Sequence, residues 1–186
     1  MTPTLTTPRL NLAPLQLEDA EQVQLIFPQW EVVKYLANIV PWPFPSDGVF
    51  TYYRDIALPA VARGEAWYWT LRLRSDPDRI IGSISLELKP DEHRGFWIAP
   101  EHRRQGLMLE ACNAVTDFWF NTLGQPVLRV PKAIANEASR RISMRQGMTM
   151  VRPETRDFVS GNLPSEIWEI TREEWNANRA TRVMTA

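Results

Sequence analysis

The segment 95–111, GFWIAPEHRRQGLMLEA, constrains the fold most, because its character changes twice within a few residues. Residues 95–99 are apolar and aromatic, which predicts a buried strand, and Pro100 ends it because proline has no N–H to give to a sheet. After a basic turn at 102–106, apolar residues recur at helical spacing and predict a helix that begins near Gly106. These apolar residues are Leu107, Ala111, Val115 and Phe118.

The turn at 102–106 has the composition of an anion-binding site. The first turn of a helix leaves backbone N–H groups unpaired, and a glycine such as Gly106 lets an anion approach them. Arg103 and Arg104 add charged donors that suit phosphate oxygens. The turn is neither a Walker loop nor a dinucleotide fingerprint, because it holds one glycine and no Gly-Lys-Ser follows. A turn with merely solvated arginines is the alternative on these residues alone.

Length and charge limit the class of protein. With 186 residues, 44% of them hydrophobic, we expect one domain over 1–186, with frayed tails at 1–6 and 179–186. The net charge of -1 argues against a nucleic-acid partner. Without an apolar run long enough for a signal peptide or membrane span, we expect a cytoplasmic protein with no membrane partner. The single cysteine, Cys112, excludes an internal disulfide and is expected to be buried and inert.

Periodicity predicts alternating strands and helices along the chain. Turn residues at 75–78 and 89–91 join three of the strands into an antiparallel meander. A capping box is expected at Thr171 and Glu174. The expected strands are 9–15, 66–73, 79–88, 92–99, 127–130, 148–152 and 166–170, and the expected helices are 18–27, 31–38, 49–63, one from 106, 136–146 and 171–178.

Two stretches resemble motifs of the GCN5-related N-acetyltransferases. Residues 103–108, RRQGLM, resemble that family's acetyl-CoA pyrophosphate loop, Arg/Gln-x-x-Gly-x-Gly/Ala, with Met108 at the last position, and the preceding FWIAPEHR resembles its strand before the loop. Residues 136–148, NEASRRISMRQGM, resemble the Asn-x-x-Ser helix beside the pantetheine arm. The opening, TPRLNLAPLQLEDAEQV, is similar to the branch that acetylates ribosomal-protein amino termini. The resemblance extends from Thr7 to about Trp175.

The resemblance implies an α/β fold with a mixed, strongly curved sheet of about seven strands flanked by helices. It also implies direct acetyl transfer from acetyl-CoA to a primary amine, a protein N-terminus or a small molecule, in a ternary complex of a monomer or homodimer without a metal. A CoA-binding sensor with little turnover is the alternative function. The expected cofactor-binding residues are Trp97, Ile98, Arg103, Arg104, Gln105, Gly106, Leu107, Met108 and Asn136.

The same resemblance places the acetyl group near residues 95–97 and suggests residues for the proton transfers. His93 is the candidate base, since an imidazole titrates near neutrality, with Glu92, Glu87 or a water chain as alternatives. Ser139 is the candidate proton donor to the thiolate, because it lies one helical turn after Asn136. On residue type alone, a solvent-facing histidine fits His93 equally well, and a plain N-cap is the better interpretation of Asn136. A local backbone bond is the alternative for Ser139.

The resemblance also implies that the Pro-rich loop at 41–47, PWPFPSD, forms one wall of the acceptor pocket. Three prolines prevent regular structure, and its aromatic side chains can either contact substrate or close the core. The candidate substrate residues are Trp42, Phe44, Tyr53 and Glu87.

Overall fold

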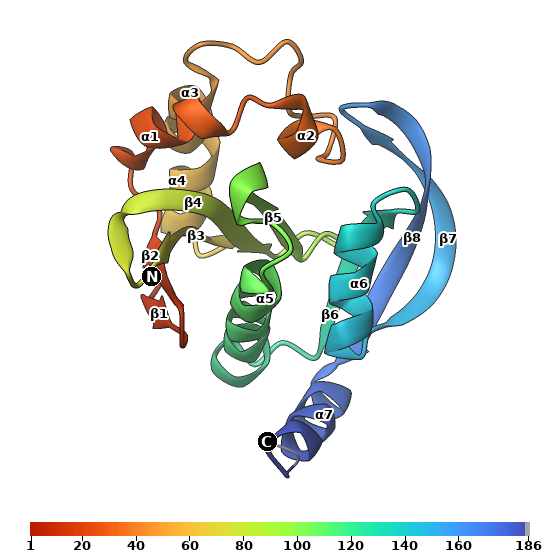
Figure 1. Cartoon of the computed structure of the whole chain (residues 1–186). Coiled ribbons are helices and arrows are strands. Elements are labelled where there is room, and N and C mark those ends of the chain that lie inside the picture. Colours follow the sequence, from red (N-terminus) through yellow and green to blue (C-terminus); the bar gives the residue numbers. More distant parts are fainter. Residues whose placement is uncertain (185–186) are drawn as a thin grey trace.

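The computed structural model describes the backbone of residues 1–184 and the side chains of residues 1–178. Its strands form a five-stranded sheet in the order β1-β2-β3-β4-β5 and a three-stranded sheet in the order β6-β8-β7 (Figure 1). The strand pairs within both sheets are antiparallel. The strands are β1 (Leu5–Thr6), β2 (Leu10–Pro14), β3 (Ala66–Leu73), β4 (Asp76–Glu87), β5 (Arg94–Ile98), β6 (Val127–Ala133), β7 (Thr149–Phe158) and β8 (Gly161–Thr171).

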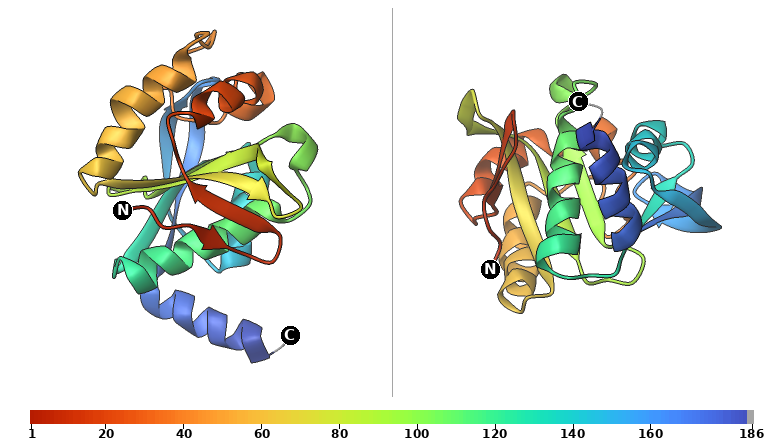
Figure 2. Two further views of the ribbon diagram at one scale, coloured as in Figure 1. Left: turned by 90° about the vertical axis from the view of Figure 1, so that its left-hand side faces the viewer. Right: turned by 90° about the horizontal axis from the view of Figure 1, so that it is seen from below.

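Helices cover both faces of the larger sheet. In Figure 2, left, α1 and α3–α4 lie on one side of β2–β5, and α5 lies on the other. The α-helices are α1 (Asp19–Ile26), α2 (Trp30–Val33), α3 (Gly48–Tyr52), α4 (Leu58–Ala62), α5 (Leu107–Asp117), α6 (Glu137–Gln146) and α7 (Arg172–Met184). Shorter helical turns are η1 (Tyr53–Ala57), η2 (Pro100–His102) and η3 (Phe118–Thr122).

The two sheets meet at the first residues of β5 and β6. The backbone N–H of His93 donates to the Arg129 carbonyl at 3.0 Å, and the backbone N–H of Arg129 donates to His93 Nδ1 at 2.9 Å. Beyond this junction the two strands belong to different sheets (Figure 1). The expected α/β fold with flanking helices is confirmed, but the described residues form eight strands rather than about seven, in two antiparallel sheets rather than one mixed sheet.

Each face of the larger sheet buries its own hydrophobic cluster. One cluster joins Trp69 and Ile84 to α5 and to β6 and β8, and the other joins Tyr68 and Ile80 to α1 and α3. Regular alternation along the strand expected at 79–88 would put Ile80 and Ile84 on one face, but in β4 they lie on opposite faces. A register shift opposite Leu71 places one extra residue in β4, so side chains beyond the shift point to the other face.

Three expected boundaries differ from the structure. The helix expected at 31–38 is only α2, and Ala37 instead pairs with Phe158. The strands expected at 148–152 and 166–170 are longer in the structure, where β7 and β8 form a long hairpin that includes Gly161. Exposed polar residues hid the strand pattern of this hairpin in the sequence. The helix expected at 49–63 forms, but it passes through the π-helical turn η1 just before Pro59, which lacks an N–H, and Asp47 supplies no side-chain cap.

The chain ends were expected to be frayed at 1–6 and 179–186. Within the described backbone, residues 5–6 pair with β2, and α7 continues to Met184, whereas 185–186 lie outside the described residues. The predicted capping box is confirmed: Thr171 Oγ1 accepts from the Glu174 N–H at 3.2 Å, and Glu174 Oε2 accepts from the Thr171 N–H at 2.9 Å. None of the helices in the described residues is long and apolar enough to cross a membrane.

Candidate active site

The turn before α5 has the backbone geometry of an anion site. Arg104 and Gly106 both adopt positive φ, 61° and 78°, and Gly106 is the N-cap of α5. A left-handed residue followed by a right-handed helical turn directs consecutive N–H groups toward one point. Because Gln105 and Gly106 are exposed, an anion can reach these groups from solvent.

A network on the N-terminal strand segment fixes this turn. Arg9 Nη1 donates to the Gln105 carbonyl at 2.9 Å, and Arg9 Nε donates to Glu110 Oε2 at 2.7 Å. Thr7 Oγ1 donates to the same carboxylate. Partial burial would raise the pKa of Glu110, but the hydrogen bonds from Thr7 and Arg9 outweigh it and hold the pKa below its ordinary value. No local sequence pattern predicts these hydrogen bonds to Glu110, because they join residues about a hundred positions apart.

The side chains of the loop separate into inward and outward groups. Leu107 and Met108 are buried in the core, so the Met108 side chain does not fill the space before the loop, where the family pattern has glycine or alanine. Arg103 Nη2 donates to the Glu31 carbonyl at 2.7 Å, which ties the loop to α2. Arg104 is exposed. Met108, the residue that departs from the family pattern, is therefore compatible with an open anion site.

The second motif forms α6. Asn136 is its N-cap, and Asn136 Oδ1 accepts from the Ser139 N–H at 3.2 Å. Ser139 is buried, with 7% of its surface exposed. Gly147 closes the helix in the left-handed conformation with φ of 79°. The structure thus gives Asn136 a capping role, and its predicted cofactor contact stays a prediction.

His93 lies at the junction of the two sheets. Its Nδ1 accepts the Arg129 N–H, so the neutral ring carries its proton on Nε2, and the ring stacks on Trp119 with centroids 4.9 Å apart. Burial is the main cause that lowers the pKa of His93; Arg129 adds to it and Asp91 opposes it. The neighbouring Glu92 forms an ion pair with Arg156.

Glu87 is the centre of a polar network that the sequence analysis found only in part. Tyr68 Oη donates to Glu87 Oε1 at 2.9 Å, and Tyr52 Oη lies 2.9 Å from Tyr68 Oη. Lys89 Nζ pairs with Glu87 Oε2 at 2.7 Å. Ser85 Oγ, which donates to Glu87 Oε1 at 3.4 Å, would be 3.2 Å from a Cβ atom built on Gly95. The network therefore faces the same side of the sheet as Gly95.

The sequence alone could not show which tyrosine hydroxyls belong to the hydrogen-bond network of Glu87. Burial is the main cause that raises the pKa of Tyr52 and of Tyr68, so both phenols stay protonated at neutral pH. Tyr53, the predicted pocket residue next to them, is buried, and its pKa is also raised by burial. The alternation of residues in β3 was the available indication, because it places Tyr68 on the face opposite the tryptophans of that strand.

Aromatic rings from the Pro-rich loop lie on this side of the sheet. Phe44 packs edge-on against Phe27 with centroids 5.1 Å apart, and Phe27 packs against Trp97 at 5.3 Å. Trp42 is 45% exposed and contacts Trp30 at 5.5 Å. Phe44 therefore closes the core, whereas Trp42 keeps a surface for a ligand.

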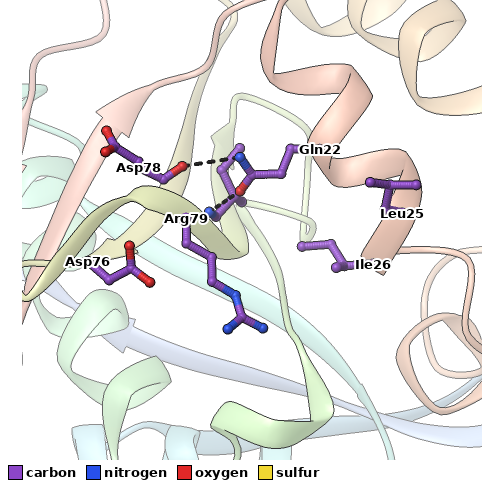
Figure 3. Close-up of a pocket in the computed structure, with 7 residues that line it drawn as sticks. Gln22, Leu25, Ile26, Asp76, Asp78 and Arg79 are labelled. Carbon is purple, nitrogen blue, oxygen red and sulfur yellow. Dashed lines mark hydrogen bonds between the residues drawn. The ribbon is translucent and has the colours of Figure 1, made fainter.

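A surface pocket of about 280 Å³ lies elsewhere, between α1 and the β3–β4 hairpin (Figure 3). Gln22 crosses it, donating to the Asp78 carbonyl at 3.1 Å and accepting from the Ile80 N–H. None of the predicted site residues lines this pocket, so it is separate from the anion site. Its lining consists of Gln22, Leu25, Ile26, Asp76, Asp78, Arg79 and Ile80. Among the described residues, no group of three or more His, Cys, Asp or Glu side chains could hold a metal ion.

Comparisons with known proteins define the class. The family model for an acetyltransferase (GNAT) domain matches residues 9–149, so the chain belongs to the GNAT acetyltransferases. It is an N-acetyltransferase that depends on acetyl-CoA. A Bacillus subtilis (strain 168) relative, "Uncharacterized N-acetyltransferase YoaA", is 31% identical over 153 residues, covering 79% of this chain and 83% of the relative.

Solved structures support the same fold. Ribosomal-protein-S5-alanine acetyltransferase from Vibrio fischeri superposes with a TM-score of 0.78 at 13% identity, covering 93% of this chain and 98% of that one. RimL, a ribosomal L7/L12 α-N-protein acetyltransferase in complex with coenzyme A, gives 0.76 at 14% identity, covering 91% and 98%. At these identities the likeness concerns the fold alone.

Proposed function

We propose that this chain transfers the acetyl group of acetyl-CoA to a primary amine by direct attack in a ternary complex. The observation that carries the proposal is the turn at Arg104–Gly106, where left-handed residues precede the start of α5, a geometry that suits a phosphate. The donors at the turn, backbone N–H groups with an exposed Arg104, suit the pyrophosphate of CoA.

For the base we propose Glu87 ahead of His93, Glu92 or water. Glu87 is a carboxylate on the Gly95 side of the sheet, and Tyr68 and Tyr52 extend its hydrogen bonds toward α3. His93 has no lone pair available while Nδ1 accepts the Arg129 N–H and Nε2 carries the proton. An amine that approaches from the α1–α3 side would therefore lose its proton to Glu87.

For the leaving thiolate we propose Ser139, a buried hydroxyl in the first turn of α6. The acceptor is a primary amine carried by a protein N-terminus or a small molecule, for which exposed Trp42 supplies an apolar contact. The ribosomal-protein enzymes among the structural neighbours motivate the inclusion of N-terminal peptides.

A thiol-release assay with acetyl-CoA and a panel of small amines and N-terminal peptides tests the proposal. We expect turnover with at least one class, and binding of acetyl-CoA without any turnover would favour the CoA sensor instead. In the same assay, Glu87→Gln should lower kcat by about a hundredfold, because the amide cannot take a proton. If His93→Ala, rather than Glu87→Gln, removes the rise of kcat/KM with pH, His93 is the base.

A further inference from the structure

Two basic side chains are buried together on the α5 side of the sheets. Arg94 at the start of β5 is 4% exposed, and Lys132 on β6 is 6% exposed. Lys132 Nζ lies 4.7 Å from the centre of the Phe96 ring, and Arg94 Cζ lies 6.0 Å from the same centre. Lys132 and Arg94 therefore approach one another across the gap between two strands that belong to different sheets.

Arg94 is only partly satisfied by its surroundings. Its Nη1 donates to Thr116 Oγ1 at 2.8 Å, whereas Nε and Nη2 are buried without a hydrogen-bond partner. Buried charged donors in proteins are normally paired, because leaving them unpaired is costly. Two donor groups of the guanidinium thus have no acceptor among the described residues.

The groups that face Lys132 supply no counter-charge. From β5, Arg94 is a second cation, and from α5, burial raises the pKa of the Cys112 thiol and keeps it neutral. On β8, Glu166 lies opposite Lys132 in the register, but its carboxylate pairs with Arg140 of α6 at 2.9 Å. Burial, with Arg94 adding to it, lowers the pKa of Lys132 to about 7.

The pair lies near the C-terminal end of α5, and the proposed phosphate turn lies at the N-terminal end of this helix. Thr116, the partner of Arg94, follows Leu107 by nine positions, which is about 13 Å along α5 from the phosphate turn. An extended pantetheine arm covers a distance of this order. The acetyl group was expected near residues 95–97. Gly95 and Phe96 in this segment lie between Glu87 and the pair formed by Arg94 and Lys132.

We propose that Arg94 and Lys132 form the binding site for the sulfur of coenzyme A and stabilise it as a thiolate. The inference rests on the proposed function. When the amine attacks, the C–N bond forms, the C–S bond breaks, and the electron pair of the latter stays on sulfur. The resulting thiolate lies beside the Arg94 guanidinium and the Lys132 amine. It takes up one proton from the Ser139 hydroxyl, which solvent reprotonates, as the amine loses one, so that amide and CoA thiol are the products. The amine proton leaves toward Glu87 on one face, and the sulfur charge develops on the other.

Binding of free CoA compared with acetyl-CoA measures this site without turnover. By calorimetry at about pH 8, we expect the wild-type protein to bind CoA about tenfold more tightly than acetyl-CoA, since only CoA can present a thiolate. Thiolate absorbance should show the pKa of the bound CoA thiol about one and a half units below that of free CoA. Lys132→Met, whose side chain is of similar length but uncharged, should bind CoA and acetyl-CoA with equal affinity. Lys132→Arg should keep the preference for CoA.

Arg141→Met removes an exposed cation of α6 and is the matched control; it should keep the wild-type preference. If Lys132→Met does not fold, Lys132→Gln carries the same expectation. Equal wild-type affinities for CoA and acetyl-CoA, or a preference that survives Lys132→Met, would overturn the thiolate site while leaving acetyl transfer intact. Failure of the wild-type protein to bind either ligand would instead overturn the proposed function on which the site rests.

Discussion

At the scale of single residues, the side chains proposed to act on the thioester lie on two opposite sides of β5. Glu87 and its tyrosines face α3, whereas Arg94 and Lys132 face α5. Gly95 separates them, and its missing side chain leaves space beside Ser85. Proton removal and thiolate stabilisation are thus assigned to opposite sides of the acetyl group, which keeps a base and a cationic site from neutralising one another.

The loop arginines give the first prediction. Charge-assisted contacts are worth roughly 1.5–3 kcal/mol each, so the double variant Arg103→Ala with Arg104→Ala should weaken acetyl-CoA binding at least about tenfold in calorimetry. The matched control, Arg54→Ala with Arg63→Ala, removes two exposed arginines from the other side of the molecule. Unchanged affinity in the loop variant would refute the phosphate assignment.

Ser139 gives the second prediction. If its hydroxyl protonates the thiolate, Ser139→Ala should lower kcat about ten- to a hundredfold with little change in acetyl-CoA affinity. Its backbone N–H, which donates to Asn136, remains in the variant, so the helix cap is preserved. Steady-state kinetics together with calorimetry separates the two effects, and a parallel loss in both would mean that Ser139 holds the cofactor.

At the scale of elements, each motif depends on how its helix begins. The start of α5 needs a left-handed residue, and Gly106 meets this need at φ of 78° with Arg9 Nη2 3.5 Å from a Cβ built there. The start of α6 needs an acceptor for an unpaired N–H, which Asn136 supplies. Both starts could be read from residue type and spacing, because these requirements are local.

Gly106→Val gives the third prediction. A β-branched residue is strained at positive φ and fills the approach to the N–H groups, so acetyl-CoA affinity should fall further than in the double arginine variant. Gly64→Val is the control, since Gly64 also has positive φ, 71°, with open space around it, and lies away from the loop. Both variants should lose thermal stability, but a fall in affinity is expected only for Gly106→Val; equal affinity losses would mean that strain alone causes the effect.

At the scale of the whole molecule, the fold depends on how its two sheets are joined. The two hydrogen bonds between His93 and Arg129 connect the edge strands β5 and β6, and the stacked Trp119 covers the imidazole. A protonated imidazole would place an N–H on Nδ1 against the Arg129 N–H and break one of these bonds. The junction is therefore sensitive to acid.

The pH dependence of stability gives the fourth prediction. Because the pKa of His93 is below its usual 6.5 in the folded protein, the unfolded chain binds a proton that the folded chain resists. This contribution to stability is complete above the unfolded pKa and is lost as the pH falls below it. The Tm of the wild-type protein should therefore fall more between about pH 7 and pH 5 than that of His93→Gln, whose side-chain oxygen can still accept the Arg129 N–H.

His102→Gln, at the other histidine, is the control and should follow the wild-type curve. Identical slopes for wild type and His93→Gln would show that the junction does not respond to the charge of the imidazole.

The sequence by itself determined those features that depend on interactions between residues a few positions apart. Periodicity and turn residues predicted the β3–β5 meander, the glycine-bearing turn before α5, the Asn136 cap and the Thr171 capping box, since each depends on neighbours within a few positions. The family resemblance added the acetyl-CoA chemistry that the matching family model supports.

Only the tertiary structure decided which distant residues meet. The register shift in β4 chose the face of Ile80, and the β5–β6 junction engaged the Nδ1 of His93. Pairing of β6 with β8, and of β5 with β4, brought Lys132 and Arg94 together beneath Phe96. These contacts depend on strand register and helix packing summed over the whole chain, where one residue of slip reverses every side chain, and no local pattern carries that information.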